Sequence, residues 1–222
     1  MSERPALDSR SRRALSALRD RAASFEVGDA GSHDAAHGWK VDDYRQPLGE
    51  EPPGDPVPDG RWETAKRLME DYEFADPKII RAIYEDDSPL EGRDMLLEAR
   101  FYGLRFHFGV RVSGVVDETR EVEDRPARVW GWNYRTLKGH FEAGQMDFEA
   151  WKWTDTGEIE FRIHSVSRVA HIPNPIVRLG FRLFGRGQQV KFCRHACQRM
   201  RRLTDETVET GARGRLSRAT GG

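Results

Sequence analysis

The sequence predicts an α+β fold in which a curved antiparallel sheet wraps around one long carboxy-terminal helix. Two observations lead to this prediction. Apolar and polar residues alternate with a period of two through most of residues 94–166, which is typical of half-buried strands. A long segment with helical spacing of apolar residues, 172–203, follows the strands and supplies the cover that an apolar sheet face needs.

One strand and two helices are expected before this sheet. Residues 37–49 are the first with strand character, and the Pro-rich stretch 50–60 after them cannot form regular structure. Residues 61–74 and 75–86 each place apolar side chains at helical spacing, so each is predicted to be a short helix. Asp76 is a good N-cap residue for the second helix.

The alternating segment is predicted to form five or six antiparallel strands. Apolar side chains occupy every second position in residues 104–112, and aromatic side chains do so in 130–134. The turn sequence TDTG at 154–157 predicts a hairpin between the last two strands. Strands connected in this way form a meander with one face available to the terminal helix.

The terminal segment is strongly basic. From Pro173 to Leu203 it contains eight Lys or Arg and no Asp or Glu, although the net charge of the chain is -1. Asn174 is predicted to cap the helix, and Gly185 and Gly187 are expected to kink or interrupt it. The sheet could grip this helix while its arginines reach water, which we favour, or the helix could lie on an anionic membrane. The basic side chains concerned are Arg178, Arg182, Arg186, Lys191 and Arg194.

Composition separates one domain from two ends. Residues 1–36 are polar and are predicted to be a disordered or frayed extension, with a short amphipathic helix in residues 10–25 as the alternative. Residues 206–222 are predicted to be a disordered tail, which leaves 37–205 as the domain. The two cysteines, Cys193 and Cys197, are predicted to be buried thiols. No signal core or membrane-spanning run is present, so we expect a cytoplasmic location, with peripheral membrane association as the alternative.

The order of elements, a strand, two short helices, a meander and a long helix, is that of helix-grip folds. The ligand-binding superfamily that includes lipid-transfer START domains, pollen allergens and polyketide cyclases has this order. In such folds a cavity lies between the sheet and the terminal helix, so this is where a ligand site is expected.

Two stretches, WNYRTLKGHFEAGQMDFEAW and GEIEFRIHSVSR, resemble an uncharacterised family, domain-of-unknown-function family nineteen-ninety. Gln145 departs from the family pattern, because relatives often have an acid there. The resemblance covers roughly residues 95–203 well. It implies a helix-grip neighbourhood and no particular reaction. The matching residues are Tyr134, Thr136, Leu137, Gly139, His140, Glu142, Gly144, Phe161, Ile163, Ser167 and Arg168.

Polar side chains that could hold a ligand gather in these stretches. His140 and Glu142 would share one strand face, where they could transfer protons or, with His164, bind a metal. Alternatively they pair with each other or with an arginine and only stabilise the hairpin. The Cys pair that zinc deaminases require is absent, and no metal or cofactor is predicted. The candidate polar residues are Tyr134, Thr136, His140, Glu142, His164, Ser167 and Arg168.

Aromatic side chains at strand spacing either line a cavity or fill the core. A nucleic-acid stacking surface is a third interpretation, which the near-neutral charge and the missing RNP motif argue against. The candidate wall residues are Phe106, Phe108, Trp130, Trp132 and Phe161.

We therefore expect a domain that binds a hydrophobic or amphipathic, lipid-like small molecule. One alternative is a cavity enzyme of cyclase, hydrolase or isomerase type with His140 and Glu142 as acid and base. The other is a membrane-surface or envelope-associated protein that uses the basic helix. We expect binding rather than catalysis.

Overall fold

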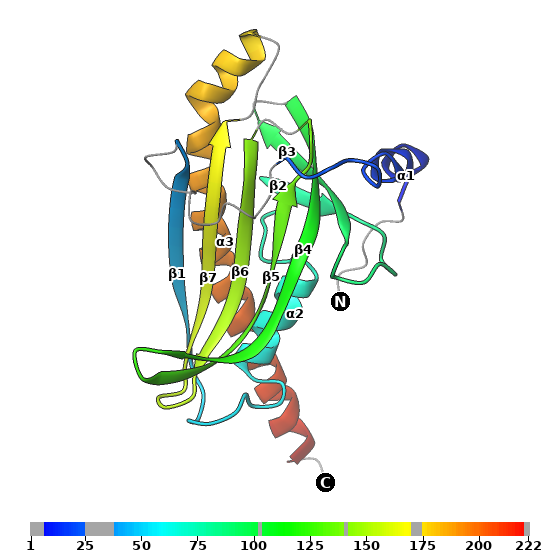
Figure 1. The fold of residues 1–222 in the computed structure, drawn as a ribbon. Helices are drawn as coiled ribbons and strands as arrows, with labels where there is room; N and C mark the ends of the chain where they lie inside the picture. Colours follow the sequence, from blue (N-terminus) through cyan, green and yellow to red (C-terminus); the bar gives the residue numbers. More distant parts are fainter. Residues whose placement is uncertain (1–6, 25–37, 102–103, 140–141, 170–174, 220–222) are drawn as a thin grey trace.

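The computed structural model describes residues 7–24, 38–101, 104–139, 142–169 and 175–219. These residues form three helices and seven strands (Figure 1). In chain order they are α1 (Ser9–Ser16), β1 (Lys40–Glu50), α2 (Arg61–Glu70), β2 (Ile80–Ile83), β3 (Asp94–Phe101), β4 (Leu104–Val122), β5 (Arg125–Thr136), β6 (Glu142–Trp153), β7 (Glu158–Val169) and α3 (Pro175–Ala219).

The strands form one curled antiparallel sheet in the order β1-β7-β6-β5-β4-β3-β2. The first strand pairs with the last, with Lys40 opposite Ser167, and the meander from β2 to β7 makes up the rest. Helix α3 crosses the concave face and contacts β1, β7 and α2 (Figure 1). The predicted helix-grip fold is confirmed.

The main core lies between the concave face and the helices. Strand alternation puts Trp132, Phe148 and Phe161 on this face, each with at most 2% of its surface exposed. Met69 of α2 and Met200 of α3 pack against them from the other side. Burying an aromatic or large aliphatic side chain contributes roughly 1.5–3 kcal/mol, so this layer holds the helices to the sheet.

The second predicted short helix is not present. Asp76 does cap one turn, because its side chain accepts a hydrogen bond of 2.8 Å from the Lys78 backbone N–H. The chain then becomes extended as β2, which pairs with β3 and places Ile80 opposite Ala99. Branched isoleucines suit a strand, and pairing along the sheet overrides the helical spacing.

The amino-terminal end is more ordered than predicted. Leu15 and Leu18 of the segment 7–24 are buried against Leu96 and its neighbours on the convex side of the sheet. Arg111 Nη2 donates hydrogen bonds to the carbonyls of Leu18, at 2.9 Å, and of Arg19. Part of the alternative predicted for residues 10–25, a short helix, is present as α1.

Helix α3 runs without a break through Gly185 and Gly187 and continues to Ala219, although 206–222 was predicted to be disordered. The predicted interruption is therefore absent. Beyond the core, an i,i+4 ion pair of 2.9 Å between Arg202 and Glu206 supports the exposed turns. Within the described part of the chain, no helix has the length and hydropathy to cross a bilayer.

Candidate functional site

The concave face of the sheet has two ends of different character. The aromatic end consists of Trp130, Trp132, Phe148 and Phe161. The polar end consists of Thr136 of β5, Ser165 and Ser167 of β7, and Asp42 of β1. Tyr134 and Met146 lie between the two ends, and they form one cross-strand row with Ser165 and Asp42.

The aromatic end is filled by its own rings. The ring centroid of Phe148 lies 5.1 Å from that of Trp132 and 4.7 Å from that of Phe74, which follows α2. The Trp132 indole N–H donates a hydrogen bond of 3.2 Å to the Met69 carbonyl. Trp130, Trp132 and Phe161, predicted as cavity wall, are thus placed inside a packed aromatic layer.

At the polar end, hydrogen bonds tie α3 to the sheet. Arg186 of α3 makes a two-pronged ion pair with Asp42 of β1. One turn along the helix, Gln189 Nε2 donates a hydrogen bond of 3.4 Å to Ser167 Oγ. Thr136 Oγ1 accepts a hydrogen bond of 3.0 Å from the Gly144 N–H. Polar groups of the helix and the sheet therefore face each other here.

Two buried hydroxyls beside this row, Tyr72 Oη and Ser165 Oγ, make no well-formed hydrogen bond to a described residue, although Tyr72 Oη lies close enough to Tyr134 to interact with that side chain. Burial raises the pKa of Tyr72 well above its ordinary value, and the neighbouring Tyr134 raises it further. Leaving a buried polar group unpaired costs about 1–3 kcal/mol. Tyr72, in the turn after α2, and Ser165, on β7, therefore leave hydrogen-bonding capacity unused.

The backbone that presents Tyr72 is itself unusual. The N–H of Tyr72 bonds to the Met69 carbonyl and that of Glu73 to the Leu68 carbonyl, the pattern of a Schellman motif at the end of α2. Its left-handed position, normally a glycine, is here Tyr72 with a φ of 57°. A non-glycine residue in this conformation costs of order 1 kcal/mol, which the buried Tyr72 ring offsets.

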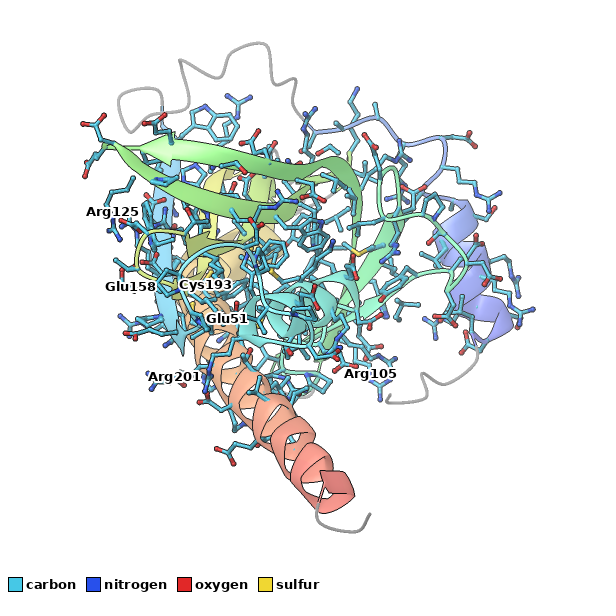
Figure 2. All side chains as sticks on the ribbon, turned by 90° about the horizontal axis from the view of Figure 1, so that it is seen from below. Glu51, Arg105, Arg125, Glu158, Cys193 and Arg201 are labelled. Atoms are coloured by element: carbon cyan, nitrogen blue, oxygen red, sulfur yellow. The ribbon has the colours of Figure 1, made fainter. Side chains whose placement is uncertain are left out.

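The predicted thiols lie close to this tyrosine. Cys193 and Cys197 are free and buried, as the sequence predicted, and Figure 2 labels Cys193 on α3. Burial raises the pKa of Cys193 to about 12 and that of Cys197 to about 11. Both side chains are therefore neutral thiols that pack as small apolar groups.

Two half-buried aromatic rings adjoin the polar end. Phe106 and Phe108 of β4 stack with parallel rings whose centroids are 6.4 Å apart. Their place follows from register, because Val110 of the same strand face lies opposite Thr136. These two predicted wall residues retain accessible surface, unlike Trp132 and Phe161.

Comparison with known families assigns the chain. Residues 24–199 match the family model described as Domain of unknown function (DUF1990). The chain belongs to this family. No curated protein matches it.

Two solved structures are similar to this DUF1990 domain at the level of a distant fold likeness. Ara h 8.0201 is 10% identical, with a TM-score of 0.43 over 76% of this chain and 99% of the other. A norcoclaurine synthase point mutant from Thalictrum flavum, in complex with a transition-state analogue, is 10% identical, with a TM-score of 0.49 over 76% of this chain and 95% of the other. Neither similarity bears on function.

Among the remaining candidate residues of the DUF1990 domain, the two whose side chains the structure describes do not join this site. His164 lies on the convex face, where its Nδ1 is 2.8 Å from Asp43 Oδ1, and Arg168 lies there over the Trp39 ring. His140 lies outside the described residues. Glu142 begins β6, but its side chain is not described, nor are those of Arg178 and Arg182 in α3. The pairing of His140 with Glu142 stays a prediction.

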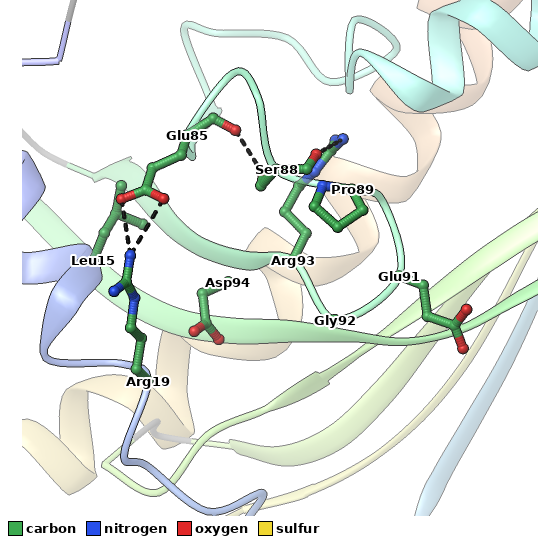
Figure 3. A pocket seen from close by; sticks show the side chains of 9 residues that line it. All are labelled: Leu15, Arg19, Glu85, Ser88, Pro89, Glu91, Gly92, Arg93 and Asp94. Carbon is green, nitrogen blue, oxygen red and sulfur yellow. Dashed lines mark hydrogen bonds and ion pairs between the residues drawn. The ribbon is translucent and has the colours of Figure 1, made fainter.

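A separate pocket of about 190 Å³ lies between α1 and the connection from β2 to β3 (Figure 3). Its wall includes Arg19, which pairs with Glu85 at 3.3 Å, and Arg93, whose Nη2 donates a hydrogen bond to the Ser88 carbonyl. Both arginines hold neighbouring chain segments together, so we assign this pocket to the docking of α1.

Proposed function

We propose that this DUF1990 domain binds a small amphipathic molecule at the polar end of the concave face. The polar group of the ligand would lie against Tyr72 Oη and Ser165 Oγ, and its apolar part against Phe106 and Phe108. The observation that carries the proposal is a pair of buried hydroxyls that make no well-formed hydrogen bond to a described residue: Ser165 Oγ, in one cross-strand row, and Tyr72 Oη, next to Tyr134 of the same row. Polar atoms of a ligand would supply the hydrogen bonds that these two hydroxyls lack.

Packing supports an amphipathic ligand rather than a purely apolar one. The rings of the aromatic end lie within contact distance of one another, so little of that surface is available to a long apolar chain. The polar end instead offers hydroxyls, the Asp42–Arg186 ion pair and two half-buried phenylalanines. This mixture suits an amphipathic molecule more than a purely apolar chain.

Ligand binding can be tested with the fluorescent amphipathic probe 8-anilinonaphthalene-1-sulfonate and by native mass spectrometry of the purified protein. Ser165→Ala and Tyr72→Phe should each weaken probe binding about fivefold, the effect of one lost hydrogen bond. Ser113→Ala is the matched control, because Ser113 Oγ donates its hydrogen bond to Asn133 away from the concave face. That variant should bind as the parent does.

The same variants give a second measurement. Removing an unpaired buried hydroxyl should stabilise the unliganded protein, so Tyr72→Phe and Ser165→Ala should raise Tm while they weaken binding. If the two hydroxyls serve a ligand, each variant should be more thermally stable than the parent and yet bind the probe more weakly. Variants that lower Tm and leave probe binding unchanged, in a protein without co-purified small molecules, would refute the proposal.

A further inference from the structure

The outer side of α3 carries a basic stripe, which we define as the two cations Lys191 and Arg194 with their neutral neighbours His195 and Gln198. At about 100° per residue these four positions fall within one face of the helix. Lys191, Arg194 and Gln198 are exposed and His195 is partly exposed. Together with Gly187 and Val190 they border a shallow hollow of about 290 Å³.

The charges of this stripe are not neutralised by the part of the protein that the structure describes. No described acidic side chain forms an ion pair with Lys191, Arg194 or His195. Other basic residues of α3 differ: Arg186 is paired with Asp42 on the inner side, and Arg202 with Glu206. Of the predicted membrane-facing residues, Lys191 and Arg194 belong to the stripe, Arg186 does not, and the side chains of Arg178 and Arg182 are not described.

We propose that the basic stripe docks the protein on an anionic lipid surface. Each Lys or Arg held near such a surface contributes about 1 kcal/mol, a fivefold change in binding. A flat membrane can meet all residues of a straight helical stripe at once. The positive region ends where Asp205, Glu206 and Glu209 follow along the helix, so the half of α3 that carries the stripe faces the membrane.

Two features favour a membrane over a nucleic acid. The net charge of the chain is -1, whereas nucleic-acid-binding domains are usually basic as a whole. The same turns of α3 present Gln189 and Cys193 to the inner side of the helix, beside the polar end. The second argument rests on the proposed function, because an amphipathic ligand would be exchanged with a membrane.

Co-sedimentation with vesicles tests the proposal. The full chain should bind phosphatidylcholine vesicles that contain phosphatidylserine and should not bind vesicles of phosphatidylcholine alone. Lys191→Ala combined with Arg194→Ala should weaken vesicle binding roughly thirtyfold. Added salt should also weaken the binding of the parent protein to the vesicles. Arg202→Ala, an exposed position with its own partner Glu206, should leave binding near the parent value.

The outcomes separate this inference from the ligand site. Vesicle binding that is equal with and without phosphatidylserine, or unchanged in the double variant, would overturn it, as would binding to RNA oligonucleotides in place of vesicles. The double variant should retain parental affinity for 8-anilinonaphthalene-1-sulfonate, because neither side chain belongs to the polar end. Loss of probe binding without loss of vesicle binding would instead count against the proposed function alone.

Discussion

Lys152 Nζ donates a hydrogen bond of 2.8 Å to Glu51 Oε2, at the end of the sheet where Glu51 is labelled in Figure 2. The Lys152 side chain is fully buried and that of Glu51 is 6% exposed. The Glu51 carboxylate also accepts hydrogen bonds from the backbone N–H groups of Val57 and Trp62. Lys152 Nζ donates a second hydrogen bond to the Asp55 carbonyl. This pair fixes the Pro-rich loop against β6.

Lys152→Met should destabilise the protein by about 3–5 kcal/mol, because it leaves a buried carboxylate without its partner. Urea unfolding followed by tryptophan fluorescence measures this. Adding Glu51→Gln to Lys152→Met should recover part of the loss, since the unpaired charge is then removed. A single variant as stable as the parent would show that the pair contributes nothing net.

Acid should weaken the fold through the same carboxylate. Burial alone raises the pKa of Glu51, but the hydrogen bonds from Lys152, Trp62 and Val57 together hold it below its ordinary value of 4.5. A carboxyl group whose pKa is lowered by folding stabilises the folded state at pH values above its ordinary pKa. This stabilisation is lost as the pH falls through the folded-state pKa. Unfolding free energies measured from pH 6 downwards should therefore drop more in the parent than in Glu51→Gln.

Arg111 should control the docking of residues 7–24. Arg111→Ala removes the hydrogen bonds to the Leu18 and Arg19 carbonyls and the ion pair with Asp94, each worth about 1.5–3 kcal/mol for a charged group. Hydrogen exchange in 9–24 should rise strongly while β5 to β7 stay protected. Arg105→Ala, an exposed arginine beside Glu98, is the control and should leave exchange in this segment unchanged.

Two glycines should respond to alanine in opposite ways. At Gly187 a Cβ would meet nothing within 4 Å, so Gly187→Ala should stabilise α3 by about 0.5–1 kcal/mol. At Gly131 a Cβ would lie 2.4 Å from the Phe148 carbonyl oxygen, so Gly131→Ala should destabilise the sheet. Thermal unfolding of both variants checks the difference in sign.

The two thiols should be unreactive in the folded protein. With pKa values raised to about 12 for Cys193 and about 11 for Cys197, hardly any thiolate is present at pH 8. Ellman's reagent should modify neither cysteine in buffer and both in urea. Fast modification without denaturant would mean that α3 opens readily from the sheet.

Local patterns predicted the strands and the terminal helix well, because a period of two survives wherever one sheet face is buried. They failed where tertiary contacts decide. Ile80 and Ile83 belong to a segment whose apolar residues have helical spacing, but in the structure they pair with β3 as a strand. The burial of Leu15 and Leu18 could not be predicted without knowing the apolar surface that they cover, which includes Leu96.

The candidate site was predictable in part. Alternation along β7 places Ser165 on the same face as Phe161, so its inward direction could have been deduced together with that of Ser167. Tyr72 could not have been found, because no sequence signal marks a tyrosine at a left-handed helix end. The inward direction of Arg186 depends on how α3 is rotated on the sheet, which its own sequence does not specify.

The pairing of β1 with β7 has a consequence for synthesis of the chain. Lys40 finds its partner Ser167 only after nearly all of the sheet has been made. Such distant contacts slow folding, because the entropy of the long intervening chain is lost before the pairing of the two strands can stabilise the fold. A nascent chain therefore leaves the ribosome with an incomplete sheet edge, and prompt folding should depend on protection from aggregation at that stage.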